Sequence, residues 1–111
     1  MVKKPQQGQV WWVSLPETDT QQPVLIIQSD AFNESELETV VCVELTPDWK
    51  LGAAPGNVVI AQTDSGLPKA CVANVSHLLT IDKEFLQQCV GTLPPLIVGS
   101  VLDGIDILLG R

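Results

Sequence analysis

The stretch QQPVLIIQSDAFN, residues Gln21–Asn33, decides the fold of this chain. Its apolar run VLII is rich in β-branched residues and follows Pro23, which predicts a buried strand that leaves a turn. Ser29 or Asp30 then supplies an N-cap for one short helical turn. Two neutral amides, Gln21 and Gln22, lead into the strand, and their role decides whether this chain is an enzyme.

Further strands are predicted on both sides of this stretch, over residues 8–15, 39–46, 57–62 and 69–81. Residues 82–91 begin with an Asp and end with Gly91, which predicts one short helix. Thr92 and the prolines that follow predict the start of a C-terminal helix. Strands first, helix last and short turns between strands predict one domain over residues 1–111. The fold class is α+β, an antiparallel sheet, curled or barrel-like, with the C-terminal helix packed on it.

Apolar side chains in the first strand and the last helix indicate where the core lies. Trp11 and Trp12 are adjacent in a strand and must point to opposite faces, so we expect one in the core and one at a surface or interface. In the C-terminal helix, apolar residues at helical spacing predict one buried face. Further apolar residues beside it widen this face, so we expect the helix to be covered on more than one side. The residues of that face are Ile97, Val101, Ile105 and Leu108.

Composition limits the class of protein. The apolar fraction is 45% and the mean hydropathy is +0.24, enough for a core, and the surplus apolar surface predicts an oligomer. No secretory signal follows Lys3 and Lys4, and no apolar run is long enough to cross a membrane, so we expect a cytoplasmic protein. The three cysteines have no CxxC spacing, and we expect them to be small buried hydrophobes. With these thiols and a single histidine, we expect no metal site and no cofactor. The cysteines are Cys42, Cys71 and Cys89.

The charge balance argues against a chain with a general attraction for nucleic acid. There are 13 acidic and 6 basic residues, a net charge of −7 and a pI near 4.3. Nucleic-acid binding draws most of its affinity from lysine and arginine at phosphates. A local basic groove has few candidate residues, namely Lys3, Lys4, Lys50, Lys69 and Lys83.

Six motifs in order carry a family resemblance. They are GQVWWVSL (8–15), PVLIIQSDAFN (23–33), VVCVELT (40–46), AAPGNVVI (53–60), GLPKACVANVSHLLTIDK (66–83) and VGTLPP (90–95). Together they resemble the MazF/PemK family of toxin endoribonucleases from bacterial toxin–antitoxin modules, from about Gly8 to Leu109. The resemblance implies a small SH3-like antiparallel β-barrel with a short helix and a C-terminal helix. It also implies a homodimer and, as partner, a cognate antitoxin peptide that fills the groove.

The resemblance further implies metal-free RNA cleavage, in which the 2′-hydroxyl of the RNA attacks the adjacent phosphorus. The family uses a threonine at the end of the third strand, which corresponds to Thr46, although a β-branched threonine also simply suits a strand end. It uses an arginine immediately before its PVLV strand, and Gln22 stands at that position. Two RNA-binding positions of the family correspond to Cys71 and His77, and an arginine of the family is Leu79 here.

These departures predict impaired or altered catalysis. Removing one charge-stabilising group from a phosphoryl-transfer site costs about 2.7–4 kcal/mol, about 10²–10³-fold in rate. The turn at residues 16–23 is also shorter than in the family. Lys50 is a candidate substitute cation or a solvated lysine, and His77 is a candidate proton-transfer group or a polar strand-end residue. Trp49 is a candidate base-stacking residue or a lid over the core.

Competing functions follow from this comparison. The first is a toxin with a ribonuclease fold and an antitoxin partner; with a charge of −7, that partner should be apolar or basic. The second is a catalytically degenerate member that serves as a binding or regulatory module. Gyrase-poisoning toxins of the same fold end in Trp-Gly-Ile, whereas this chain ends in ILLGR, so that third reading fits poorly.

Overall fold

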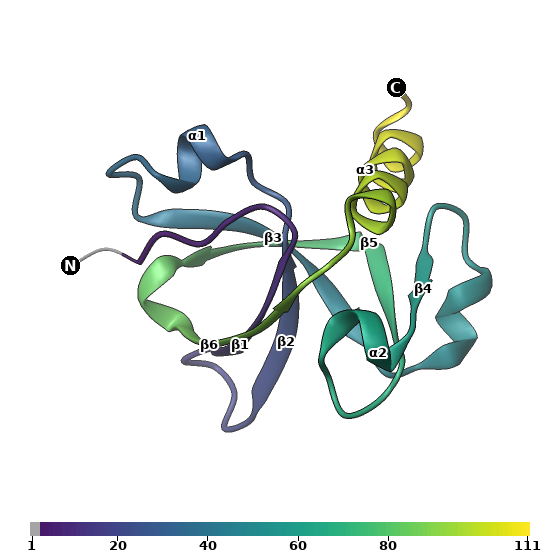
Figure 1. The fold of residues 1–111 in the computed structure, drawn as a ribbon, viewed down its shortest axis with the longest axis horizontal. Coiled ribbons are helices and arrows are strands. Elements are labelled where there is room, and N and C mark those ends of the chain that lie inside the picture. Colours follow the sequence, from purple (N-terminus) through teal and green to yellow (C-terminus); the bar gives the residue numbers. More distant parts are fainter. Residues whose placement is uncertain (1–2) are drawn as a thin grey trace.

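Six strands form one antiparallel sheet in the order β4-β5-β3-β2-β1-β6 (Figure 1). The computed structural model describes residues 3–111. The strands are β1 (Gln9–Ser14), β2 (Gln21–Ile26), β3 (Thr39–Thr46), β4 (Val58–Ile60), β5 (Cys71–Asp82) and β6 (Leu86–Thr92). The helices are α1 (Asp30–Asn33), α2 (Gln62–Ser65) and α3 (Pro95–Leu109), with 3₁₀ turns η1 (Trp49–Ala53) and η2 (Lys83–Phe85). The sheet curls strongly and α3 packs on it, which confirms the predicted α+β class.

Both faces of the curled sheet are buried, because successive side chains of a strand point to opposite sides. On β2, Val24 and Ile26 face one core and Leu25 faces the other. The helix-side core contains Val10, Leu25, Val43, Leu45, Ile60, Leu67, Cys71, Ala73, Val75, Leu93, Val101 and Ile105. The second core contains Val13, Val24, Ile26, Val40, Cys42, Ile81 and Leu86. Each fully buried aliphatic side chain contributes roughly 1.5–3 kcal/mol.

Strand β5 is irregular where it pairs with β3. Val43 lies opposite Leu78, but Glu44 lies opposite Asn74, whereas a regular antiparallel ladder would pair Glu44 with His77. Residues 75–77 of β5 therefore have no pairing partner on β3, and β5 bends at these residues. The bend lets the first part of β5 pair with β4 and places His77 beside Glu44.

The predicted helix over residues 82–91 is wrong. Only the turn η2 is helical, and the chain then continues as β6, which pairs with β1 through Trp11 opposite Cys89. The register with β1 decides the structure here, because a short segment of mixed polarity fits either form. Thr92 ends β6 and is no helix cap; the N-cap of α3 is Pro94, with Pro95 in the first turn. Cys89 of β6 is exposed, so only Cys42 and Cys71 are buried as predicted.

The two tryptophans contact different cores. Trp11 packs against the second core and Trp12 against the helix-side core, and both are half-buried. The opposite-face prediction is confirmed, whereas the expectation of only one core tryptophan is wrong because both sheet faces are buried. On α3, Val101 and Ile105 are buried, but Leu108 is exposed. No helix within residues 3–111 is long and apolar enough to cross a membrane.

Candidate functional site

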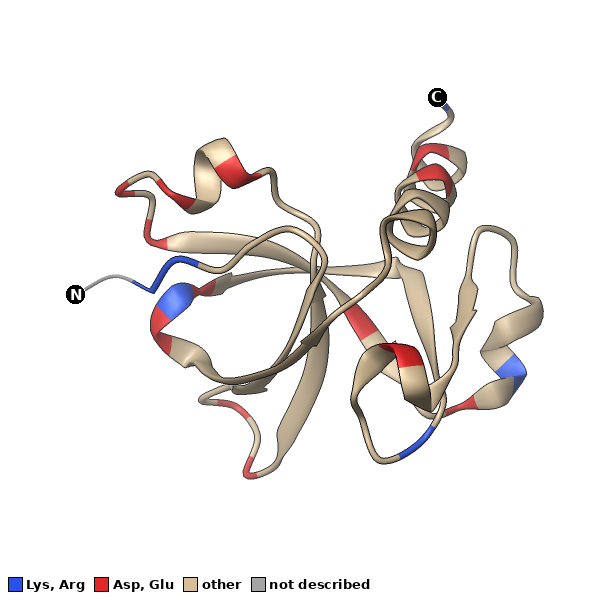
Figure 2. Ribbon diagram, viewed as in Figure 1, with Lys and Arg blue, Asp and Glu red and all other residues tan. Residues whose placement is uncertain are grey.

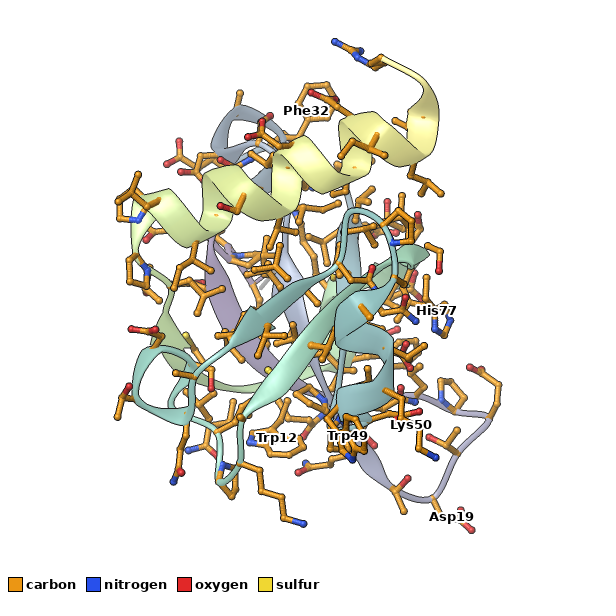
Figure 3. All side chains as sticks on the ribbon, turned by 90° about the vertical axis from the view of Figure 1, so that its right-hand side faces the viewer. Trp12, Asp19, Phe32, Trp49, Lys50 and His77 are labelled. Carbon is orange, nitrogen blue, oxygen red and sulfur yellow. The ribbon has the colours of Figure 1, made fainter. Side chains whose placement is uncertain are left out.

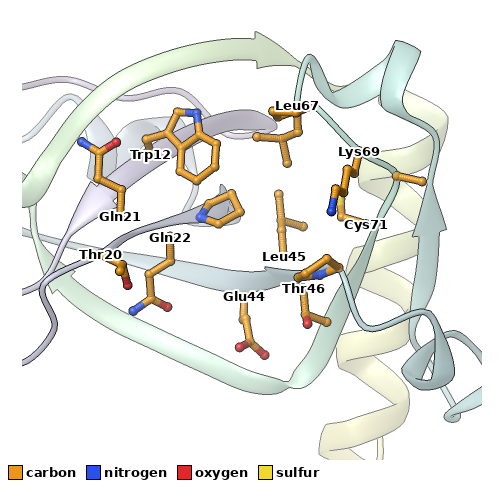
Figure 4. A pocket seen from close by; sticks show the side chains of 14 residues that line it. Trp12, Thr20, Gln21, Gln22, Glu44, Leu45, Thr46, Leu67, Lys69 and Cys71 are labelled. Carbon is orange, nitrogen blue, oxygen red and sulfur yellow. The ribbon is translucent and has the colours of Figure 1, made fainter.

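A pocket of about 510 Å³ lies where three strand ends meet (Figure 4). Val24 of β2 lies opposite Glu44 of β3, and Thr46 lies opposite Val72 of β5. This register brings the start of β2, the end of β3 and the start of β5 to one edge of the sheet. The pocket is lined by Trp12, Thr20, Gln21, Gln22, Pro23, Glu44, Leu45, Thr46, Pro47, Leu67, Pro68, Lys69, Ala70 and Cys71.

The pocket combines an apolar floor with a polar rim. Trp12, Leu45 and Leu67 belong to or pack against the helix-side core and form apolar lining. Figure 4 shows Gln21 and Gln22 on one side and Lys69 on the other, with Glu44 and Thr46 between them. The charged lining consists of one carboxylate and one ammonium group. An apolar floor with a few polar groups is typical of a ligand site.

Thr46 is half-buried at the end of β3 and its side chain has a fixed neighbour. Its hydroxyl oxygen accepts a hydrogen bond from the backbone N–H of Asp48, with a distance of 3.2 Å. The Asp48 carboxylate in turn accepts from the backbone N–H of Lys50 at 3.2 Å, which begins the turn η1. The Thr46 hydroxyl donates to no other group in the described part of the chain, so its proton is available to a ligand in the pocket.

Glu44 connects the pocket to a polar network on β5. One of its carboxylate oxygens, Oε2, accepts from Nδ2 of Asn74 at 3.1 Å and lies 3.0 Å from Nδ1 of His77. Oδ1 of Asn74 also accepts from Asn57 at 3.3 Å and from Ser76 at 3.1 Å. His77 is therefore bound to a residue that lines the pocket without lining the pocket itself.

Three of the residues singled out from the sequence come together and three do not. Gln22, Thr46 and Cys71 line the pocket. Trp49 and Lys50 lie in η1, outside the lining, and Figure 3 shows Lys50 and His77 projecting outward. Trp49 is 78% exposed, so it is not a lid over the core.

Burial raises the pKa of Cys71 to about 11, so its thiol is neutral near pH 7. A neutral, buried thiol is a weak nucleophile and a poor anion, and Cys71 therefore acts as part of the apolar lining. In residues 3–111, no three His, Cys, Asp or Glu side chains are grouped as a metal site.

The lysines of the predicted basic groove do not gather in one place, and the chain has more acidic than basic residues (Figure 2). Lys83 is buried and donates to the carbonyl of Asn33 at 3.0 Å, so it cannot contact a ligand. Sequence reasoning left Trp12, Glu44 and Lys69 out of the site. Only the pairing of β2, β3 and β5 brings them to the pocket, although Lys69 was visible as a basic-groove candidate.

A family model described as the PemK-like, MazF-like toxin of type II toxin–antitoxin systems matches residues 6–109. The chain belongs to this toxin family. Endoribonuclease MazF6 of Mycobacterium tuberculosis and Endoribonuclease MazF2 of Mycobacterium bovis are each 36% identical to it over 107 residues, covering 92% of this chain and 94% of each relative.

Solved structures agree with this membership. A mycobacterial endoribonuclease in complex with its cognate antitoxin has a TM-score of 0.80 and 25% identity, covering 96% of this chain and 95% of that chain. The MazE–MazF structure from Deinococcus radiodurans has a TM-score of 0.79 and covers 100% of this chain and 98% of that chain. At 19% identity, this second structure shows that the PemK/MazF-like fold is shared. The curled six-stranded sheet is therefore the sheet of MazF toxins.

Proposed function

We propose that this PemK/MazF-like toxin is a metal-independent endoribonuclease with a reduced cleavage rate, and that the pocket is its active site. The observation that carries the proposal is the meeting of Thr46 and Gln22 in one pocket, at the positions that resemble the family's catalytic threonine and arginine. The curated relatives are named endoribonucleases, which supports RNA as the substrate. We propose that the protein acts in the cytoplasm, where a toxin that cleaves RNA meets its substrate.

The proposed reaction forms and breaks bonds only in the RNA. The 2′-oxygen forms a bond to the adjacent phosphorus and the bond from phosphorus to the 5′-oxygen breaks. A base takes the 2′-hydroxyl proton and the leaving 5′-oxygen receives a proton from water or an acid. The Thr46 hydroxyl donates to a nonbridging phosphoryl oxygen. His77 is the candidate base predicted from the sequence; it lies outside the pocket lining and is held by Glu44, so it could take the proton only from RNA that extends past Glu44.

The reduced rate follows from Gln22. A neutral amide donates a hydrogen bond but brings no positive charge to the phosphoryl group, and the neighbouring carboxylate of Glu44 opposes an anionic substrate. The loss of one charge-stabilising group corresponds to about 10²–10³-fold in rate. Trp49 and Lys50, on the exposed turn η1, are candidates for contacts with RNA beyond the pocket.

We also propose a homodimer and an antitoxin peptide as partners. Exposed apolar side chains on α3 support a partner surface, since Leu96 is 86% exposed and Ile107 and Leu109 are also exposed. A solved relative is an endoribonuclease bound to its cognate antitoxin. With a net charge of −7, this chain favours an antitoxin segment that is apolar or basic.

Cleavage of mixed-sequence RNA in the presence of EDTA tests the proposal. Thr46→Ala should lower the rate about 10²-fold or more. Thr39→Ala is the matched control, because Thr39 is a half-buried threonine at the other end of β3, outside the pocket. Equal rates for wild type and Thr46→Ala would reject Thr46 as a catalytic residue.

A second candidate function has support in the same pocket. Gln22 is neutral where the resemblance implies an arginine, and Glu44 adds a carboxylate to the lining, which suits a binding or regulatory module that no longer cuts RNA. Complete absence of cleavage by wild-type protein, together with stable antitoxin binding, would favour that function over the endoribonuclease.

A further inference from the structure

We infer that Lys69 is the phosphate-binding cation of the pocket and supplies the positive charge that Gln22 lacks. The inference rests on the proposed function, because it assumes that the pocket receives an RNA phosphate. Lys69 lines the same pocket as Thr46 and Gln22, and Figure 4 shows it across the pocket from Gln22. It is exposed, and it lies in the loop between α2 and β5.

The other basic side chains of residues 3–111 are unsuitable for this role. Lys83 is buried with its ammonium group on main-chain carbonyls, and Lys50 lies in η1 outside the lining. The remaining three also have partners: Lys3 donates to the carbonyl of Leu86, Lys4 to the carbonyl of Glu34, and Arg111 pairs with Asp106. Among the described side chains, Lys69 makes no hydrogen bond or ion pair and alone brings a cation to the pocket.

The loop that carries Lys69 is anchored at its N-terminal end, by Gly66 and Leu67. Gly66 ends α2 with a φ of +79°, and a Cβ there would lie 2.5 Å from the carbonyl oxygen of Val90, so only glycine fits this approach to β6. Leu67 is buried in the helix-side core, and its N–H donates to the buried Ser65 hydroxyl at 3.1 Å. Pro68 then restricts the backbone immediately before Lys69. The lysine therefore projects from a fixed loop base, with only its side chain to be ordered on binding.

The chemistry of an ammonium group fits a partial substitution. Lysine is a compact charge with three donors and lacks the planar fork with which arginine binds two phosphoryl oxygens. It would neutralise a phosphoryl oxygen in a pocket that also contains the Glu44 carboxylate, while Thr46 donates a second bond. Lys69 transfers no proton in this role; it holds the phosphate and stabilises its charge.

The test measures RNA binding without cleavage. A fluorescent 12-nucleotide RNA of mixed sequence with 2′-O-methyl groups cannot be cut, and anisotropy gives its affinity at several NaCl concentrations. Each phosphate contact in a single strand contributes about 0.7 to the slope of log K against log salt. We expect Lys69→Met to lower the slope by about 0.7 and Lys69→Arg to restore it. Arg111→Met is the charge-matched control and should keep the wild-type slope, because Arg111 is exposed at the end of α3, pairs with Asp106 and lies outside the pocket lining.

Two results would overturn the inference: an unchanged slope for Lys69→Met, or an equal loss for Arg111→Met. A parallel assay on unmodified RNA separates this inference from the proposed function. Slope loss in Lys69→Met without any cleavage by wild type would support Lys69 and reject the endoribonuclease. Cleavage by wild type together with an unchanged slope for Lys69→Met would support the endoribonuclease and reject Lys69 as the phosphate-binding cation. Wild type that binds no RNA at low salt would reject both.

Discussion

Gly104 of α3 gives the sharpest structural prediction, because the helix contacts the chain before β4 at this residue. A Cβ built on Gly104 would overlap the carbonyl oxygen of Gly56 and lie 2.9 Å from its carbonyl carbon. Both partners are backbone, so no side-chain rotation relieves the overlap, and Gly104 is buried. Gly104→Ala must therefore push α3 away from the sheet and loosen the helix-side core.

The magnitude follows from two opposing effects. Overpacking in a core costs about 1–3 kcal/mol, and a backbone overlap belongs at the upper end of this range. Alanine recovers about 1 kcal/mol relative to glycine inside a helix, which leaves a net loss of about 2 kcal/mol. With an unfolding entropy of about 2.1 cal/mol/K per residue, a chain of this length should melt about 9 °C lower.

Gly99→Ala is the control in the same helix. Nothing lies within 4 Å of a Cβ at Gly99, so this variant should gain about 0.5–1 kcal/mol and melt about 2–4 °C higher. Calorimetry of wild type and both variants at one protein concentration measures the shifts. A Gly104→Ala protein that melts at or above wild type, or equal shifts of the same sign for both variants, would refute the close approach of α3.

Three further predictions concern buried groups. Native protein at pH 8 should react with iodoacetamide at Cys89 only, because Cys42 and Cys71 are buried and burial raises the pKa of their thiols to about 12 and about 11. Above pH 9 the unfolded thiols ionise first, so the unfolding free energy should fall as pH rises. Mass spectrometry that finds rapid labelling of all three thiols would contradict the fold. Lys83→Met should lower the unfolding free energy by about 2 kcal/mol in urea titrations, because the carbonyls of Asn33 and Ser35 lose their donor. An unchanged urea midpoint would show that this lysine stabilises nothing.

Local sequence was sufficient for most of the sheet. Strand β3 covers residues 39–46 as predicted, because five of the eight residues of TVVCVELT are β-branched. Strand β6 was missed, because LQQCVGT has no pattern that separates an edge strand from a short helix. Its pairing with β1 is a long-range contact, and the sequence of β6 alone does not contain it.

The site was predictable only as far as the family resemblance reached. Thr46 and Gln22 were singled out because motifs align them with the family's catalytic positions, and both line the same pocket. Glu44 and Lys69 depend on how β2, β3 and β5 are paired. The proximity of His77 to Glu44 depends further on the irregular pairing at residues 75–77, and no local sequence pattern predicts this irregularity.

The single-turnover cleavage rate of Gln22→Arg relative to wild type tests the central claim most directly. The substrate is one mixed-sequence RNA with EDTA present, and Gln21→Arg is the matched control, because it adds the same charge at the neighbouring, more exposed residue. We predict that Gln22→Arg cuts about 10²–10³-fold faster than wild type and that Gln21→Arg gains far less. Equal rates for Gln22→Arg and wild type would contradict the claim that this pocket is a ribonuclease site weakened at one residue.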